Sequence, residues 1–598
     1  MAGLRIGDGR GWSFMGSQWS DGPDGELLPP EVREGEFPWL DSPEIECLAV
    51  RSDEAYGDFS ARFRFRSPDY WGSGAARLMF RVQDSRRFYA LDVPWCGQQV
   101  RARHFWAGMV IADGTALQRY LNFAMVPGLC AKWGSWYEAR VEARGPRLRA
   151  WIEDILVADV EDHTYASGRL GLGCVTLSKT FHFAGLEVDG ASVMPAPWPG
   201  LVPLPQHWMS PCPVIDPDTC QGYASILDGG SGKLLLCLGI GNPARGDVRR
   251  AVYLRSSDAG KTWAAPEPAT LQVGLYPNFV RQDGTWVCVY PNAPPHGIGY
   301  PWTLYTYETN DEGRTWKRPH ELKMGGELPE GWSPPGPTAI VRMHDGSLLL
   351  VLDAYWEKPP GLGPEFLTVG TSFAMRSEDD GRTWSAPVRC DSSNRHPGEP
   401  IPTGTFEAAL AGTGGETRFA EVRENVVMGI CRPGRDPYMW KRQSSDGGRT
   451  WEPSAIGPFP GYCPSLTVTA SGAVVATTRF PHFAAHLTRD GGRTWDPPVI
   501  VDYAIWANQQ AVEAEPDVVV VTYMGYCMEP GKADSRIARL RVTPEGLVLD
   551  HYIGVKAGLR EGVTPSSKKH GRTERPTPGD ARIGGGRRKI MTGPFPEN

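Results

Sequence analysis

The stretch SSDGGRTW, residues 444–451, recurs along the chain and decides the fold. Its pattern is Ser or Thr, any residue, Asp, any residue, Gly, any residue, Thr and Trp. The other copies are SSDAGKTW (256–263), TNDEGRTW (309–316), SEDDGRTW (377–384) and TRDGGRTW (488–495). Chance does not repeat an octapeptide five times, so the region is an internal repeat with inserted loops of variable length.

Each octapeptide follows a short predicted strand, and a predicted hairpin lies before that strand, as in FVRQDGTWVCVYP and AIVRMHDGSLLLVLD. A hairpin, a third strand, the octapeptide turn and a fourth strand form a four-stranded sheet. Six such hairpins occur, and six such sheets around one axis form a six-bladed β-propeller. The Ser/Thr and Asp side chains can bond backbone N–H groups of a tight turn, and Gly supplies a positive φ. One carboxylate per loop is too few for Ca²⁺ or Mg²⁺, so we expect no metal.

Residues 1–190 hold no octapeptide and alternate apolar with polar residues, as in FSARFRFRS and WYEARVEA. This alternation predicts antiparallel strands packed as a two-sheet sandwich. The sequence therefore predicts an all-β chain with four parts. They are a β-sandwich over 1–190, a proline-rich linker over 191–211, a six-bladed propeller over 212–555 and a basic, disordered tail over 556–598.

The bulk composition excludes several function classes. A net charge of −7 on 598 residues does not indicate a nucleic-acid partner. No apolar run approaches the ~18 residues of a membrane span, and the start of the chain has no apolar export region. We therefore expect no membrane partner and, by default, a cytoplasmic location. The 12 cysteines are scattered singly without CxxC pairs, so we expect buried free thiols and no cofactor.

The repeats resemble the Asp-boxes of sialidases (neuraminidases) and related BNR-repeat propellers. The stretch from AYGDFSARFRF to FHFAGLEVDG resembles the jelly-roll domains of the concanavalin-like lectin and glucanase group. Both resemblances imply a carbohydrate partner, and tryptophans such as Trp106 and Trp136 could stack on sugar rings. Asp-boxes also occur in xyloglucanases, lyases and non-enzymatic receptors, so the activity must be argued from a site.

The register of the predicted hairpins places four charged residues on the same rim of the propeller. Glu416 opens a predicted strand and Arg432 closes its partner, so the two share that rim. Arg479 has the same register as Arg432 in the next blade, and Asp353 has it in the preceding blade. Two arginines aimed at one axis suit a carboxylate, which a guanidinium binds through two parallel hydrogen bonds.

The sialidase resemblance gives these residues expected roles. In sialidases a Glu pairs with a nucleophilic Tyr, three arginines hold the substrate carboxylate, and an Asp is the general acid/base. Glu416 and Arg432 match this motif in ETRFAEVRENVVMGICR, and Arg479 matches a second arginine. The resemblance further implies Asp247 as the acid/base, with Asp353 as its rival.

The sequence departs from the sialidase pattern at two places. The first arginine belongs to an F/Y-R-I-P motif, where this chain reads QGYASIL. The nucleophilic tyrosine should open the sixth blade, where this chain reads ANQQAVE, which leaves Tyr503 as a substitute. The rim of the second blade is predicted to carry Tyr276, Tyr290 and His296 as substrate-binding residues.

Three hypotheses about the function follow from these residues. The first is a sialidase-like exo-glycoside hydrolase that acts on a terminal acidic sugar of a glycan or polysaccharide. The second is a propeller enzyme of another class, such as a polysaccharide lyase or another exo-glycosidase. The third is a non-catalytic glycan-binding protein.

Overall fold

The computed structural model contains only β-strands, β1 to β42, among the residues it describes. No helix in this part of the chain is long and apolar enough to cross a membrane. The described residues are 11–15, 19–22, 26–28, 46–67, 73–96, 105–115, 117–130, 132, 134–176, 181–201, 224–240, 250–271, 274–292, 303–329, 332, 336–357, 368–391, 416–432, 438–480, 482–502, 510–524 and 535–550. The predicted tail over 556–598 and residues 202–211 of the predicted linker lie outside them.

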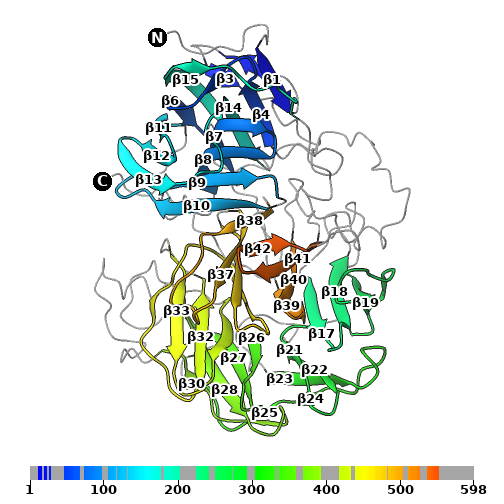
Figure 1. Cartoon of the computed structure of the whole chain (residues 1–598). Coiled ribbons are helices and arrows are strands. Elements are labelled where there is room, and N and C mark those ends of the chain that lie inside the picture. The colour runs from blue at the N-terminus through cyan, green and yellow to red at the C-terminus, as the bar shows by residue number, and fades with distance from the viewer. Residues whose placement is uncertain are drawn as a thin grey trace, which may run out of the picture.

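The N-terminal strands form two antiparallel layers, shown at the top of Figure 1. The first layer runs β1 (Trp12–Met15), β4 (Glu46–Arg51), β14 (Arg169–Thr176), β7 (Ser73–Asp84), β8 (Arg87–Cys96), β9 (Trp106–Asp113) and β10 (Gln118–Met125). The second runs β13 (Ile155–Glu161), β12 (Arg147–Ile152), β11 (Tyr137–Arg144), β6 (Phe59–Arg66), β15 (His182–Asp189), β3 (Glu26–Leu28) and β2 (Ser20–Asp21). A short pair, β5 (Ala55–Tyr56) and β16 (Ser192–Val193), stands apart.

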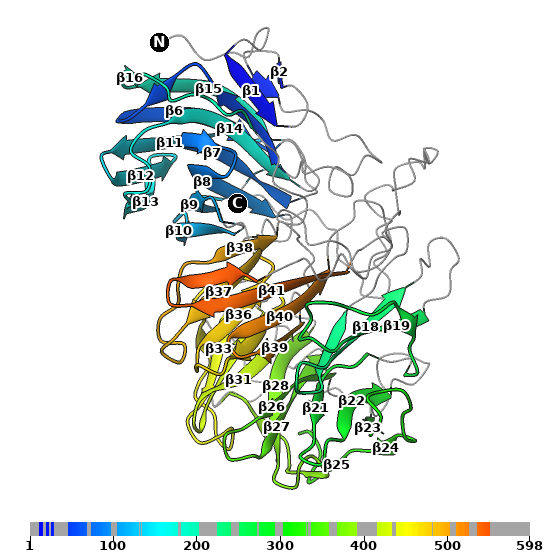
Figure 2. The same ribbon diagram turned by 45° about the vertical axis from the view of Figure 1, so that its right-hand side comes forward.

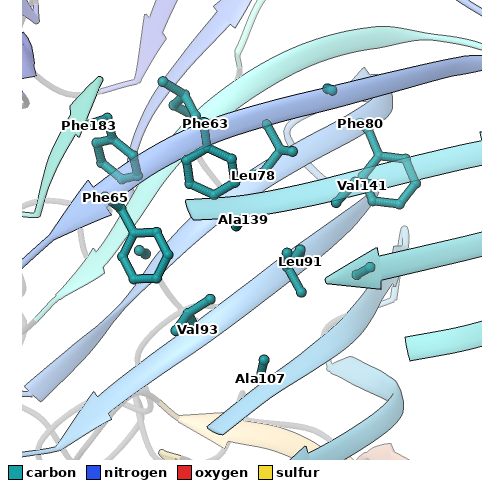
Figure 3. Packing of buried hydrophobic residues seen from close by; sticks show 14 of the residues in the cluster. Phe63, Phe65, Leu78, Phe80, Leu91, Val93, Ala107, Ala139, Val141 and Phe183 are labelled. Carbon is teal, nitrogen blue, oxygen red and sulfur yellow. The ribbon is translucent and has the colours of Figure 1, made fainter. Parts of the chain in front are cut away.

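The predicted strand alternation explains why the two layers pack together. On β6, Phe59, Phe63 and Phe65 are buried while the arginines between them face outward. These phenylalanines belong to one apolar core with Leu78 and Leu91 of the facing layer. Figure 3 shows Phe63 and Phe65 in this core with the two leucines. Burying alternate apolar side chains between two sheets is the main stabilising term of such a layer pair. The jelly-roll assignment of this region stays a prediction.

The C-terminal half contains the blades of a β-propeller, five of which are separate four-stranded antiparallel sheets (Figure 1). The first two are β17 (Ser225–Asp228) with β18 (Leu234–Ile240), β19 (Arg250–Ser256) and β20 (Glu267–Pro268), and β21 (Asn278–Val280) with β22 (Trp286–Asn292), β23 (Thr303–Thr309) and β24 (His320–Glu321). The next two are β26 (Gly336–Arg342) with β27 (Leu348–Glu357), β28 (Thr368–Ser377) and β30 (Val388–Arg389), and β31 (Arg418–Arg423) with β32 (Val426–Cys431), β33 (Trp440–Ser444) and β34 (Ala455–Ile456). The fifth is β39 (Gln510–Glu515) with β40 (Val518–Met524), β41 (Ser535–Thr543) and β42 (Gly546–Leu549). A two-residue parallel pair joins β25 (Lys323–Met324) to β29 (Thr383–Trp384).

One further group of strands links the two halves. The group comprises β35 (Ser465–Val468), β36 (Val474–Thr478), β37 (Phe483–Thr488) and β38 (Val499–Asp502), which pair in chain order. Because β38 also pairs with β10, the group forms the end of an 11-stranded sheet that includes the first N-terminal layer (Figure 2). The first strands of all the groups, β17, β21, β26, β31, β35 and β39, contact one another in a closed ring.

The octapeptide forms the turn between the third and fourth strands, as predicted. Ser444 Oγ donates to Asp446 at 2.8 Å and accepts the Gly448 N–H at 2.8 Å. Thr450 donates to Asp446 through its N–H at 2.8 Å and its hydroxyl at 2.6 Å. The same four hydrogen bonds surround Asp258, Asp311, Asp379 and Asp490.

The turn also contacts the neighbouring sheet. Gly448 has φ +83°, and a Cβ at this position would lie 2.8 Å from Leu349 Cδ1 on β27 of the preceding sheet. The octapeptide tryptophan Trp451 packs edge-on against Phe419, with ring centroids 5.2 Å apart. Glycine is therefore required here both for the backbone angle and for the close approach.

Candidate active site

Glu416 and Arg432 lie together at the open end of the β31–β32 hairpin, opposite its turn. Glu416 comes two residues before β31, and Arg432 follows β32 directly. Arg432 Nη1 donates to both carboxylate oxygens of Glu416 at 2.9 Å each. The Arg432 and Glu416 side chains are 32% and 38% exposed, so the pair is open to solvent on one side. Antiparallel pairing brings the start of one strand to the end of the next, as the register argument expects.

The loop before β35 and the residue after β36 complete the cluster. Cys463 Sγ donates to Glu416 Oε2 at 2.9 Å. The ring centroid of Tyr462 lies 5.4 Å from the Arg432 guanidinium and 5.7 Å from that of Arg479. The backbone N–H of Arg479 donates to the Tyr462 carbonyl at 3.2 Å. The structure thus brings Glu416, Arg432 and Arg479 into one cluster, while their roles stay predictions.

The electrostatics of the cluster keep Glu416 ionised. Burial would raise the pKa of this carboxyl, but Arg432 and Arg479 outweigh that effect and hold it below its ordinary value. Burial raises the pKa of the Cys463 thiol to about 12, with Glu416 adding to the rise and Arg479 opposing it. Cys463 therefore keeps its proton at neutral pH and donates it in the hydrogen bond to Glu416.

Asp353 lies beneath Glu416 rather than beside it. Its side chain, on β27, is 2% exposed. Asp353 Oδ2 accepts the backbone N–H groups of Glu416 at 2.6 Å and Thr417 at 3.2 Å, and Oδ1 accepts the Ser372 hydroxyl at 2.6 Å. Glu416 has φ +71°, a left-handed conformation that non-glycine residues rarely adopt. The geometry places Asp353 where it holds this strained backbone.

Tyr276 and a third arginine, Arg418, extend the cluster toward the second blade. The Tyr276 hydroxyl donates to the Thr338 carbonyl, and burial raises the pKa of that hydroxyl. The Arg418 guanidinium lies 4.8 Å from the Tyr276 ring centroid. Sequence reasoning missed Arg418. Glu416 lies before β31 with φ +71°, so strand alternation does not fix which face the two side chains share. Tyr290, on β22, is half-buried and makes no such contact with the cluster among the described residues.

Three predicted site residues cannot be placed. Asp247, His296 and Tyr503 lie outside the described residues. The described part of the chain also contains no group of three or more His, Cys, Asp or Glu residues arranged to hold a metal ion.

Two of the sandwich tryptophans, Trp106 and Trp136, differ in exposure. Trp106 is buried, with 1% of its surface exposed. Trp136 is partly exposed, and the guanidinium groups of Arg66 and Arg64 lie 4.8 and 5.5 Å from its ring centroid. Trp106 instead packs at the junction between the two halves of the molecule.

Comparison with known proteins gives matches for both halves. Residues 7–185 match the model of a family described as a 3-keto-alpha-glucoside-1,2-lyase-like domain. A search among curated proteins found no significant match.

The solved structures that resemble this chain include carbohydrate-active enzymes. A protein of unknown function from Dyadobacter fermentans is 16% identical over 55% of this chain and 96% of its own, with a TM-score of 0.41. A Hadza microbial sialidase is 13% identical over 81% of this chain and 93% of its own, with a TM-score of 0.41. An alpha-L-arabinofuranosidase from Fusarium graminearum is 15% identical over 55% of this chain and 95% of its own, with a TM-score of 0.34.

Proposed function

We propose that this protein is a sialidase-like exo-glycoside hydrolase that acts on a terminal acidic sugar of a glycan or polysaccharide. The observation that carries the proposal is the Glu416–Arg432 pair, an ionised carboxylate bonded at 2.9 Å to a solvent-open guanidinium. A second guanidinium, that of Arg479, lies on the same Tyr462 ring. A carboxylate beside two cations in a partly buried setting is an arrangement typical of functional sites.

The chemistry of the pair suits glycoside hydrolysis. An ionised Glu416 can accept a proton from the hydroxyl group or water that attacks the sugar, and its charge stabilises an oxocarbenium-like transition state. Arg432 uses only Nη1 toward Glu416, so its remaining N–H groups have no partner among the described residues. These groups, together with Arg479, are proposed to bind the substrate carboxylate.

We infer that β35 to β38 form the sixth blade, because β35 lies in the ring of first strands that closes from β39 to β17. The octapeptides are then Asp-boxes. In this proposal Asp247 is the general acid, and His296 and Tyr290 contact the substrate. Tyr503, which directly follows the end of β38, supplies the nucleophile.

The test compares Glu416→Gln and Arg432→Ala with the wild type on aryl sialosides, aryl uronides and uncharged aryl glycosides. Glu416→Gln should lower kcat by about 10²–10⁴-fold, the range of general acid–base catalysis. Arg432→Ala should raise KM for the acidic substrates most. Glu424 is exposed and lies at the opposite end of the same hairpin, so Glu424→Gln is the matched control and should change neither kcat nor KM. Wild-type turnover by Glu416→Gln on every substrate would reject the site.

A second candidate function follows from the family match on residues 7–185, which cover the sandwich and not Glu416. The description of that family is lyase-like, which favours a polysaccharide lyase or another exo-glycosidase. Unsaturated products that persist in Glu416→Gln would favour this candidate. Binding on a glycan array without turnover of any substrate would instead favour a non-catalytic glycan-binding protein.

A further inference from the structure

The sandwich and the propeller are joined by a shared sheet. Gln118 and Arg119 on β10 pair with Ile500 and Val499 on β38. The Tyr120 N–H donates to the Pro498 carbonyl at 3.0 Å, which extends the contact by one residue. Figure 2 shows β10 lying beside β38, directly above the strands β36 and β37. Hydrogen-bonded pairing of this kind fixes the two halves in one relative position.

Trp106, the first residue of β9, packs across this junction. Its ring stacks on Phe123 of β10, with ring centroids 5.3 Å apart and planes inclined by 7°. It meets Tyr438 and Phe480 of the propeller edge-on, with both centroid distances at 5.6 Å. Aromatic contacts of this geometry stabilise by about 0.5–1.5 kcal/mol each beyond the area they bury.

The same apolar cluster contains residues of the candidate site. Trp106 and Phe480 are buried in one cluster with Tyr462 and Cys463. Cys463 donates to Glu416, and the Tyr462 ring lies against both arginines of the site. A single layer of side chains therefore separates the sandwich from the charged groups.

We propose that the sandwich is a structural part of the active site and that Trp106 is its positioning residue. Trp106 holds Tyr462 and Cys463, which in turn orient Arg479 and Glu416. A smaller side chain at Trp106 would leave a cavity into which Tyr462 could shift. Because a displacement of about 1 Å can cost a factor of about 10² in rate, such a shift should reach the chemistry. The catalytic consequence rests on the proposed function, whereas the packing consequence does not.

The kinetic test uses the full chain with Trp106→Leu, Trp106→Phe and Phe63→Leu. Phe63 is a buried residue of the sandwich core that packs on Phe65 and Phe183, so it controls for loss of sandwich stability alone. Trp106→Leu should lower kcat/KM by about 10–100-fold on the substrate that the wild type turns over. Trp106→Phe should restore most of the loss, and Phe63→Leu should leave kcat unchanged. Equal kinetics for Trp106→Leu and Phe63→Leu would overturn the proposal.

A second measurement does not depend on any activity. Cys463 is 6% exposed, so iodoacetamide should modify it slowly in the native wild type. Mass spectrometry of the Cys463 peptide should show several-fold faster modification in Trp106→Leu and no change in Phe63→Leu. An unchanged rate in Trp106→Leu would overturn the packing inference. If Cys463 is modified faster in Trp106→Leu but the wild type turns over no glycoside, the packing inference is supported and the proposed function is rejected.

Discussion

The octapeptide turns and the Glu416 cluster are both polar and partly exposed, but their hydrogen bonds connect differently. In each turn the aspartate is satisfied within its own eight residues, and the arrangement repeats five times. At Glu416 the partners come from β27, from the end of β32 and from the loop before β35. Among the residues that the structure describes the cluster occurs once, and its Glu416 backbone is strained at φ +71°.

This contrast separates scaffold from candidate site. A polar group whose partners all lie in its own turn is explained by that turn alone, and its repetition in five turns indicates that the fold needs it. A charged group that is held by distant segments in a strained conformation is stabilised by its surroundings, which is typical of functional positions. Variants measured for both stability and activity test this division.

The largest effect on stability is expected from Asp353→Ala, which should lower both the stability and the activity of the protein. The change leaves the N–H groups of Glu416 and Thr417 without their acceptor, while the Ser372 hydroxyl keeps Thr417 Oγ1 at 3.0 Å. Each buried unsatisfied donor costs about 1–3 kcal/mol, so the free energy of unfolding should fall by about 2–5 kcal/mol. Activity should fall as well, because Glu416 loses the support of its backbone.

Urea unfolding and kcat measured on the same preparations check this prediction. Glu424→Ala is the control, since that side chain is exposed and lies at the far end of the β31–β32 hairpin. A change in unfolding free energy no larger than the control's would show that Asp353 does not brace the site. Lost stability with normal kcat would make Asp353 part of the scaffold.

Asp446→Ala should affect stability without affecting activity. It removes the acceptor for Ser444 Oγ, for the Thr450 N–H and for the Thr450 hydroxyl. Loss of these bonds should lower the free energy of unfolding by about 1–3 kcal/mol. Ser445→Ala, a neighbour whose hydroxyl bonds only the exposed Glu452, should have little effect on either. A fall in kcat for Asp446→Ala under conditions where it is fully folded would contradict the scaffold role.

The same contrast explains which features the sequence could predict. The octapeptide turn was predictable because every partner lies within eight residues. The Glu416–Arg432 contact was also predictable, because antiparallel pairing fixes which strand ends meet. The contacts of Cys463 with Glu416 and of Asp353 with the Glu416 backbone depend on how neighbouring blades twist and pack, which no local pattern encodes.

The pairing of β10 with β38 was not predictable for a related reason. The sequence places residues 1–190 and the propeller in separate domains, and nothing in the pattern of either strand marks it as the edge that joins them. Trp106 illustrates the same limit. Its residue type fits a sugar-binding surface, a core or an interface equally well, and only its neighbours across the junction distinguish them.

A smaller effect is expected from a matched pair of glycines. Gly448 and Gly472 have φ of +83° and +81°, so alanine at either should cost about 1–2 kcal/mol in backbone strain. Only at Gly448 would the new Cβ meet a neighbour, 2.8 Å from Leu349 Cδ1, whereas nothing lies within 4 Å at Gly472. Thermal unfolding should therefore show Gly448→Ala as the less stable variant. Equal melting temperatures would mean that Leu349 moves aside freely and that the turn does not lock the neighbouring sheet.

The smallest effect is expected from the pH dependence of the turns. Hydrogen bonds from the Thr315 hydroxyl and N–H, with Thr309, hold the pKa of Asp311 at about 2. An aspartate in an unfolded chain has a pKa of about 3.9. The stabilisation of the fold by ionised Asp311 is therefore fully present above that pH and is lost as the pH falls toward 2. Asp311→Asn should therefore be less stable than the wild type at neutral pH, by under about 1 kcal/mol because the site is largely solvated. In urea unfolding the difference should stay constant from pH 7 to pH 5 and shrink between pH 4 and pH 3. A difference that persists unchanged to pH 3 would mean that the shape of the aspartate side chain stabilises the turn and its charge does not. The hydrogen bonds within the turn, which distinguish it from the Glu416 cluster, would then not depend on ionisation of the aspartate.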